Sequence, residues 1–355
     1  MAISNVGLPA IRAQVGSALD EFLGRQRRAL SGIAPDMLPW MDAIGGLLAS
    51  GKRLRPAFCY WGWRAAAGED CPQVHAAAAA LELLHASALV HDDLIDGSET
   101  RRGQPAVHRR FAAAHADGGW RGSAEAFGAA AAVLIGDLLM AWTDELFHAS
   151  GLPDPALRRG QPVLDAMRAE LVCGQYLDVL GQAAGDGTVS SAMRVAVYKS
   201  AKYTVERPLQ LGAALAGASP PLATACADYG ARVGLAFQLR DDVLGVFGDP
   251  AQTGKPADGD LREGKRTVLV AIARERGSAA QRDLLDRRLG DPLLDDAGAD
   301  EIRTVLTGTG AVAECELMID ANVAEGLAAL DDAPMTGAAK LALADLAVIA
   351  TARSD

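Results

Sequence analysis

The stretch ELLHASALVHDDLIDGSETRR (82–102) predicts a helix in which carboxylates emerge from an apolar, Ala/Leu-rich surrounding. Asp92 and Asp96 are four residues apart, so both lie on one helix face, whereas Asp93 is rotated by about 100° and is expected to assist them. Gly97 follows as a helix-ending glycine. Adjacent carboxylates in an apolar helix need a cation to offset their repulsion, and oxygen ligands without a nearby cysteine suit Mg²⁺.

A second acidic cluster, QLRDDVLG (238–245), lies on another apolar helix. Gln238 and Asp241 share a face at i and i+3, which makes Asp241 the candidate metal ligand here. Two such clusters predict divalent cations on either side of a polyanionic substrate.

The segment DPAQTGKPADGDLREGKRT (249–267) follows the second cluster and is predicted to be a loop, since it is rich in Gly, Pro, Asp and Lys. Lys255 and Lys265 on this loop are suited to close over a phosphate group. Arg262 and Arg266 are interpreted as ordinary solvated charges.

Further cations cluster although the chain has a net charge of −11. In GKRLRP (51–56), Lys52 and Arg55 are expected to share one helical face. Arg101 and Arg102 come directly after the first acidic cluster, and guanidinium groups bind phosphate oxygens in a bidentate way. A diphosphate substrate would explain why cationic side chains cluster at these positions in an acidic chain.

Lys199 and Ser200 lie on a helix that Pro208 is expected to kink or end. A lysine on a buried face followed by a hydroxyl indicates another diphosphate contact. His85 lies two helical turns before Asp92 on the same face, so it is either a core histidine or a substrate ligand.

Composition favours an all-α fold, because Ala and Leu are abundant and aromatic residues make up only 5% of the chain. The Ala-rich stretches 76–90 and 128–142 predict buried helices, and 114–125 and 285–300 predict loops. Without a linker-like segment, residues 1–355 are expected to form a single domain.

The remaining composition limits the cellular setting. Five scattered cysteines without metal-like spacing indicate a reducing, cytoplasmic location. The N-terminus lacks the pattern of a signal peptide, and we expect no membrane-spanning helix. The acidic balance argues against nucleic-acid binding.

Together these motifs resemble the trans-isoprenyl diphosphate synthases, the polyprenyl synthetase family, most like those that make geranylgeranyl diphosphate. The resemblance runs from Gly51 to Leu269, in family order and spacing, and rests on GKRLRP (51–56), ELLHASALVHDDLIDGSETRRGQPAVH (82–108), YKSAKYTVERPLQLGA (198–213), and FQLRDDVLGVFGD (237–249) with TGKPADGDLREGKRTVL (253–269). It implies a helical bundle around a central active-site cavity, usually a homodimer, that condenses isopentenyl diphosphate with an allylic diphosphate and releases diphosphate.

The resemblance also implies a role for each matching residue. Two Mg²⁺ ions would be bound by Asp92 and Asp96, and a third by Asp241. The allylic diphosphate would be held by Arg101, Lys199 and Lys255, with Ser200 and Gln238 nearby. Isopentenyl diphosphate would be held by Lys52, Arg55, His85 and Arg102.

One position departs from the family pattern. The second cluster often reads DDxxD, but its fifth position here is Gly245. Asp241 is the key ligand, so we expect activity to survive. Asp249 does not replace the missing carboxylate at helical spacing.

Product length depends in part on the residues one helical turn before the first cluster, because these side chains would form the end of the pocket that holds the growing prenyl chain. Ser87 and Ala88 are both small, whereas short-chain enzymes of the farnesyl type often have an aromatic residue there. Leu84 and Leu81, further down, could stop the chain later. We therefore favour a twenty-carbon product, geranylgeranyl diphosphate, over a fifteen-carbon or a longer one.

Other functions fit less well. A class I terpene cyclase needs a different second metal motif, and a phosphohydrolase reading of His91–Asp92 lacks further histidine ligands. A phosphate-binding loop at GLLASGK (46–52) fails at Arg53, where Ser or Thr should follow. A non-catalytic partner subunit would be expected to lose metal carboxylates.

Overall fold

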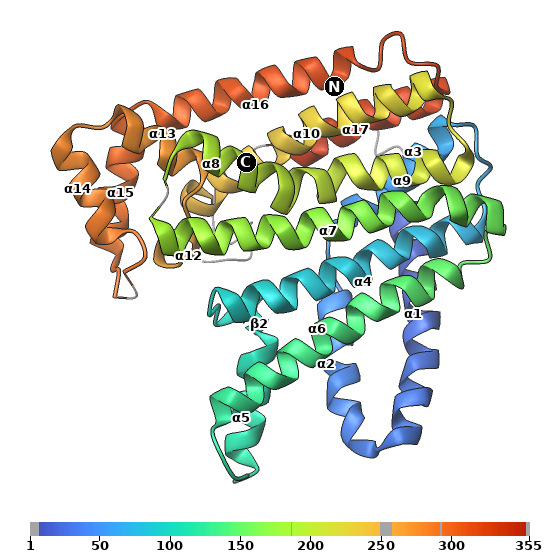
Figure 1. The fold of residues 1–355 in the computed structure, drawn as a ribbon, viewed down its shortest axis with the longest axis horizontal. Coiled ribbons are helices and arrows are strands. Elements are labelled where there is room, and N and C mark those ends of the chain that lie inside the picture. Colours follow the sequence, from blue (N-terminus) through green and yellow to red (C-terminus); the bar gives the residue numbers. More distant parts are fainter. Residues whose placement is uncertain (1–6, 186, 249–257, 292, 353–355) are drawn as a thin grey trace. The chain divides into compact units, whose positions relative to one another are not determined.

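The structure is a computed structural model that describes residues 7–185, 187–248, 258–291 and 293–352. Helices account for nearly all of its regular structure, which confirms the all-α prediction (Figure 1). Within the described residues, the only strands are β1 (Thr100–Arg101) and β2 (Gln104–Pro105), which pair in an antiparallel hairpin.

The chain forms two compact units, and each is built from three separate segments. Unit 1 consists of Met1–Gln161, Leu211–Ala218 and Thr336–Ala342. Unit 2 consists of Pro162–Gln210, Ser219–Met335 and Leu343–Asp355. Because the segments interleave along the sequence, neither unit is a contiguous stretch of chain, and the single domain over 1–355 stays a prediction.

Unit 1 holds the helices before residue 150, in which α4 packs against α6 and α6 against α5 (Figure 1). Their bounds are α1 (Leu8–Ile33), η1 (Pro35–Met37), α2 (Leu38–Leu48), α3 (Leu54–Ala65), α4 (Pro72–Ile95), α5 (Val107–Asp117) and α6 (Ala124–His148).

Helix α4 is buried on most of its circumference, as its Ala-rich sequence predicts. Small residues let α6 approach it closely. A Cβ atom at Gly136 on α6 would lie 2.1 Å from Nε2 of His91 on α4. The Ser87 hydroxyl donates a hydrogen bond to the Gly136 carbonyl at 2.8 Å. The position of α4, which carries the first acidic cluster, is therefore fixed by α6.

Unit 2 is centred on α10, which packs against both η2 and α16. Three helices, α7, α9 and α17, contribute residues to both units. The bounds are α7 (Asp154–Ala184), α8 (Val189–Val195), η2 (Ala196–Glu206), α9 (Arg207–Ala216), α10 (Pro220–Phe247), α12 (Gly259–Arg262), α13 (Val268–Arg276), α14 (Ala279–Arg288), α15 (Asp296–Gly308), α16 (Ala311–Ala328) and α17 (Gly337–Thr351).

Two predicted loops are shorter than expected. Helix α5 continues to Asp117, so the loop predicted at 114–125 begins later. Most of 285–300 is helical, because α14 continues to Arg288 and α15 starts at Asp296. Side-chain caps explain the second difference, since Asp295 accepts a hydrogen bond from the Gly298 backbone at the start of α15.

The segment that carries Lys199 is a π-helix, η2, and Arg207 next to Pro208 starts a new helix after it. Glycines in neighbouring helices make room for its backbone. A Cβ at Gly174 on α7 would lie 2.3 Å from the Lys199 backbone nitrogen, and one at Gly234 on α10 would lie 2.5 Å from the Ala201 carbonyl oxygen. π-Helical turns often occur at functional sites, because they redirect side chains.

Arg240 on α10 holds α16 through a buried ion pair. Its guanidinium donates to both carboxylate oxygens of Glu316, at 2.6 and 2.8 Å, and its Nε donates to the Thr351 carbonyl. Arg240→Ala leaves Glu316 without this guanidinium, so we expect a loss of about 3–5 kcal/mol in the free energy of unfolding. Arg232→Ala, which breaks an exposed pair with Glu325 at 3.1 Å, should cost at most about 1 kcal/mol. Denaturant titration of both variants checks this, and equal losses would contradict it.

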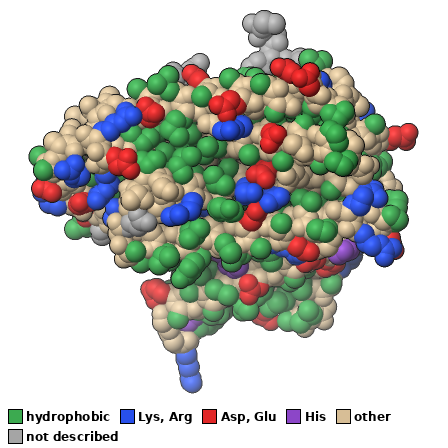
Figure 2. Space-filling model, turned by 45° about the horizontal axis from the view of Figure 1, so that its top comes forward, with side chains coloured by type: hydrophobic (Ala, Val, Ile, Leu, Met, Phe, Trp, Pro, Cys, Tyr) green, Lys and Arg blue, Asp and Glu red, His purple; other side chains and the backbone are tan. Residues whose placement is uncertain are grey.

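Two helices, α4 and α6, are long and apolar enough to cross a membrane by length and composition alone. The expectation that no helix spans a membrane therefore stays a prediction. The apolar window of α4 is 72% buried inside the structure and that of α6 is 44% buried. On the face that Figure 2 shows, acidic and basic side chains are interspersed among apolar ones.

Candidate functional site

The first acidic cluster lies at the C-terminal end of α4. Asp92 is half-buried, Asp93 is fully buried, and Asp96 caps the helix, donating its backbone N–H to the Asp92 carbonyl at 2.8 Å. Gly97 has a φ of 67°, the left-handed conformation expected of a glycine that ends a helix. The predicted helix and its end are thus in place.

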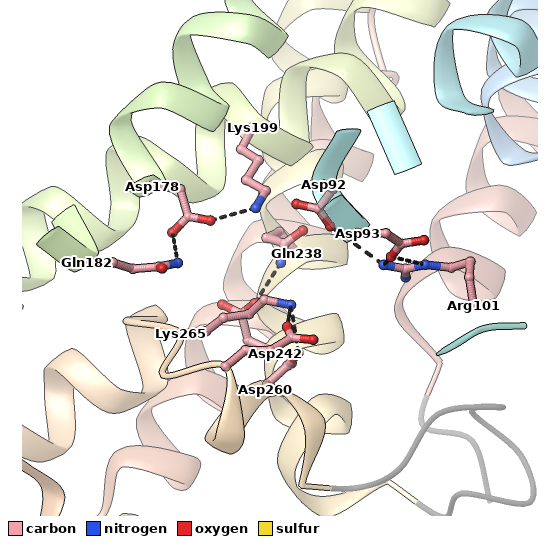
Figure 3. Close-up of polar contacts among 11 residues, drawn as sticks. Asp92, Asp93, Arg101, Asp178, Gln182, Lys199, Gln238, Asp242, Asp260 and Lys265 are labelled. Carbon is pink, nitrogen blue, oxygen red and sulfur yellow. Dashed lines mark hydrogen bonds and ion pairs between the residues drawn. The ribbon is translucent and has the colours of Figure 1, made fainter. Parts of the chain in front are cut away.

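Arg101 on β1 points toward this cluster (Figure 3). Its Nε donates to Oδ1 of Asp93 at 2.8 Å, and its Nη2 lies 3.7 Å from Oδ2 of Asp92. Arg102 and Gly103 form the turn between the two strands, with φ values of 54° and 74°, as a tight hairpin requires. Asp93 therefore orients Arg101, which is predicted to bind the diphosphate, and is not expected to coordinate the metal ion itself.

His85 lies on α4, two helical turns before Asp92, within electrostatic range of four guanidinium groups. Burial lowers the pKa of His85 well below its usual 6.5, and the charges of Arg55, Arg102, Arg101 and Arg53 lower it further. His85 is therefore neutral at pH 7, so its ring can donate or accept a hydrogen bond without adding charge. Such a concentration of positive charge favours an anionic ligand.

Lys52 does not lie on a helix, which corrects the prediction that it shares a helical face with Arg55. Helix α3 begins at Leu54, and Arg53 before it is left-handed, with a φ of 55°. A left-handed residue interrupts helical periodicity, so the spacing of Lys52 and Arg55 carries no facial information. Lys52 is exposed and Arg55 is half-buried.

The second acidic cluster lies on α10 and separates its two aspartates. Asp241 is exposed, whereas Asp242 is buried and accepts a hydrogen bond from the Gln238 side-chain amide at 2.6 Å (Figure 3). Burial raises the pKa of Asp242 well above 3.8, and the neighbouring charges of Asp241 and Asp260 add to this. The exposed carboxylate of Asp241 is the one that is accessible to a cation.

Gly245, the departure from the DDxxD pattern, faces the side chain of Asp260. A Cβ atom at position 245 would lie 1.9 Å from Oδ2 of Asp260. Lys265 donates to Oδ1 of Asp260 at 3.0 Å and pairs with Glu263 at 2.6 Å. The space that a fifth-position side chain would need is therefore taken by a carboxylate from another element.

That carboxylate comes from α12 (Gly259–Arg262), so the segment 249–267 is not entirely a loop. Lys255 and Asp249 belong to 249–257 and lie outside the described residues. The predicted role of Lys255 stays a prediction.

Gly245→Asp, which restores the family pattern, is expected to lower the rate of the predicted condensation by about tenfold or more, because the new side chain overlaps Asp260 and adds a carboxylate beside those of Asp241 and Asp260. The double variant with Asp260→Gly should recover most of the activity. Steady-state kinetics of both variants checks this, and full activity of the single variant would contradict it.

Lys199 on η2 donates to Oδ2 of Asp178 on α7 at 2.6 Å, and Gln182 donates to the other oxygen of Asp178 at 3.3 Å (Figure 3). Ser200 next to Lys199 is half-buried. Sequence reasoning missed Asp178, and it missed Glu82 on α4, which pairs with Arg53. In both cases the available signal was a single acidic residue in an apolar helical run, which needs a cationic partner.

The residues of the two acidic clusters fit Mg²⁺ by their chemistry, since Asp92, Asp96 and Asp241 offer only carboxylate oxygens. Among the described residues, no group of three or more His, Cys, Asp or Glu side chains could hold a metal ion by itself. Mg²⁺ commonly keeps several waters and shares its coordination shell with substrate phosphates.

Comparisons with known proteins show which family the chain resembles. Residues 40–306 match the family model described as polyprenyl synthetase. A short chain isoprenyl diphosphate synthase from Methanothermobacter thermautotrophicus is 34% identical over 75% of this chain and 76% of its own length. A geranylgeranyl diphosphate synthase from Mycobacterium tuberculosis is 31% identical over 92% of this chain and 88% of its own. The crystal structure of a geranylgeranyl pyrophosphate synthase from Corynebacterium glutamicum, complexed with isoprenyl diphosphate and magnesium, superposes with a TM-score of 0.94 at 38% identity, covering 98% of this chain and 99% of the other.

Proposed function

The chain belongs to the polyprenyl synthetase family and is a chain-elongating prenyltransferase that acts on isoprenyl diphosphates, and on that premise we propose that its main product is geranylgeranyl diphosphate. The enzyme would join isopentenyl diphosphate head-to-tail to an allylic diphosphate. Dimethylallyl, geranyl or farnesyl diphosphate would serve as the allylic primer, and diphosphate would be released.

The family depends on Mg²⁺, and we propose that three ions act with the substrate, held by Asp92 and Asp96 on α4 and by Asp241 on α10. Bound Mg²⁺ supplies Lewis-acid stabilisation of the charge that develops on the leaving diphosphate. Lys199, Arg101 and Lys255 would bind the oxygens of the same diphosphate, with Ser200 and Gln238 beside them. Because Asp93 and Asp178 already orient Arg101 and Lys199, these cations need little reorganisation when the bond breaks.

The second substrate, isopentenyl diphosphate, would be bound by Lys52, Arg55, His85 and Arg102. Of these, Arg55 and Arg102 lie close enough to His85 on α4 for their charges to lower its pKa. Holding the double bond of isopentenyl diphosphate next to the allylic carbocation supplies proximity. The released diphosphate would take the final proton, as the family resemblance implies.

The observation that carries the twenty-carbon product is the size and exposure of Ala88 on α4. Ala88 lies one turn before Asp92 on the half-buried side of the helix, which also carries His85 and Leu89. A side chain this small leaves room for the growing prenyl chain at the first turn. Leu84, a turn earlier, is fully buried and would belong to the deeper wall.

Incubation with isopentenyl diphosphate, each allylic primer in turn and Mg²⁺ tests the proposal, with products dephosphorylated and sized by mass spectrometry. A single twenty-carbon alcohol is expected. Fifteen-carbon or longer alcohols would keep the reaction and correct the product length. A cyclised hydrocarbon, or activity only after mixing with a homologue, would overturn the reaction assigned here.

We also propose a homodimer, supported by exposed apolar side chains along α6. Phe127, Val133 and Leu134 are 38%, 43% and 53% exposed, and large apolar side chains left exposed on one helix are consistent with a protein interface. Leu134→Arg is therefore expected to shift the protein from dimer to monomer in light scattering coupled to size-exclusion chromatography. Leu341→Arg on α17, where Leu341 is 68% exposed, should leave the dimer intact. A dimer that survives Leu134→Arg would exclude this face.

We also propose that the protein does not span a membrane, because the apolar window of α4 is 72% buried inside the structure. A cytoplasmic location without nucleic-acid partners agrees with the net charge of −11 and with the five unpaired cysteines.

A further inference from the structure

The segment that carries Lys52 joins the end of α2 to the start of α3, and two guanidinium groups hold it. Arg102 Nη1 donates to the carbonyls of Leu47 at 2.5 Å and Ser50 at 2.6 Å. Arg53 Nη2 donates to the carbonyl of Leu48. The last carbonyls of a helix lack intrahelical donors and form the negative end of its dipole, so these two cations cap α2.

Arg53 is also tied to α4. Its Nη1 donates to Oε2 of Glu82 in an ion pair whose two side chains are only 8% and 3% exposed. Burying two charges costs desolvation that their attraction only partly offsets. A pair in this position is therefore a weak source of stability, and its value lies in what it orients.

The backbone at Arg53 has the left-handed φ of 55°, which non-glycine residues rarely adopt. Arg53 is the residue before α3. Its backbone conformation therefore sets where Lys52, before the helix, lies relative to Arg55, in the first turn of the helix. Strained backbone of this kind persists only when surrounding contacts over-determine it. The bonds to Leu48 and Glu82 are those contacts.

We propose that the Arg53–Glu82 pair positions residues of the isopentenyl diphosphate site. The pair holds Lys52 and Arg55 in the geometry that binds the diphosphate, and it does not itself contact the diphosphate. The buried carboxylate of Glu82 fixes the guanidinium, the guanidinium fixes the left-handed turn, and the turn fixes the two cations. This inference rests on the proposed function, in which Lys52 and Arg55 bind isopentenyl diphosphate.

The test replaces the pair with apolar residues of similar size, Arg53→Met with Glu82→Leu, which removes the buried charges together and so preserves folding. Steady-state kinetics are measured with isopentenyl diphosphate and farnesyl diphosphate varied separately. We expect KM for isopentenyl diphosphate to rise about tenfold or more, with kcat and the KM for farnesyl diphosphate within about threefold. The control removes an exposed pair of the same unit, Arg27→Met with Asp42→Leu, which should leave all constants unchanged.

Arg53→Lys is a second, milder variant, because a lysine keeps the charge near Glu82 but lacks the fork that reaches Leu48 as well. It should also raise KM for isopentenyl diphosphate selectively. If either variant melts near the wild-type temperature and keeps the wild-type KM, the pair is merely structural and the inference is overturned.

Lys52→Ala separates this inference from the proposed function. If Lys52→Ala raises KM for isopentenyl diphosphate and the pair variants do not, only the positioning role fails. If Lys52→Ala leaves that KM unchanged, the assignment of the site fails, and the positioning role falls with it.

Discussion

Asp92→Ala is expected to lower kcat/KM for condensation by about a thousandfold, which corresponds to about 4 kcal/mol of transition-state stabilisation. Asp92 presents a half-buried carboxylate at the end of α4, where a cation bound by it would contact the leaving diphosphate. The fold should be unaffected, because Arg101 bonds to Asp93 at 2.8 Å and lies 3.7 Å from Asp92. Product formation measured across a Mg²⁺ titration, with a thermal melt, checks both expectations.

Two controls define this result. Glu21→Ala removes a carboxylate on α1 that is 78% exposed and should leave activity unchanged. Asp93→Ala should instead lower the melting temperature, since it leaves the guanidinium of Arg101, only 10% exposed, without its nearest carboxylate. Activity of Asp92→Ala within a few-fold of the wild type would show that the metal assignment is wrong.

The helices and the acidic clusters could be predicted from the sequence, because their signals are local. The Ala-rich stretches 76–90 and 128–142 both predict buried helices, and they lie within α4 and α6. The first is largely buried, whereas Val133 and Leu134 in the second are exposed, so the buried position predicted for 128–142 is only partly correct. The end of α4 was equally local, since Gly97 permits the left-handed turn.

The wrong prediction for Lys52 has a long-range cause. Helical spacing alone places Lys52 and Arg55 on one face, but the conformation of Arg53 depends on Glu82, which lies 29 residues away. The same reason hid the partner of Lys199, because Asp178 lies 21 residues before it on another helix. Pattern reasoning finds the charged groups, and only tertiary packing decides which of them pair.

The space beside Gly245 is a third case of this kind. Helical periodicity gives no information on α12, whose Asp260 lies 15 residues after Gly245 and fills that space. A motif of five consecutive positions contains no information about a side chain that another helix contributes to the same space.

Ala88→Phe is expected to shorten the main product from twenty carbons to fifteen or fewer. Ala88 lies one turn before Asp92 on the half-buried side of α4, so a phenyl ring there would occupy the path of the growing chain. The metal ligands and the cations stay unchanged, so the overall rate of condensation should fall by no more than about tenfold. Mass spectrometry of the dephosphorylated products measures the change directly.

Ser87→Phe is the matched variant, since it places the same ring one residue earlier on the helix. Ser87 is fully buried and its hydroxyl donates to the Gly136 carbonyl at 2.8 Å, so this ring would press against α6. We expect a loss of about 1–3 kcal/mol in the free energy of unfolding from overpacking, and no single shorter product. If Ser87→Phe shortens the product and Ala88→Phe leaves it at twenty carbons, the growing chain follows the side of α4 that packs on α6, and the present assignment of its floor is wrong.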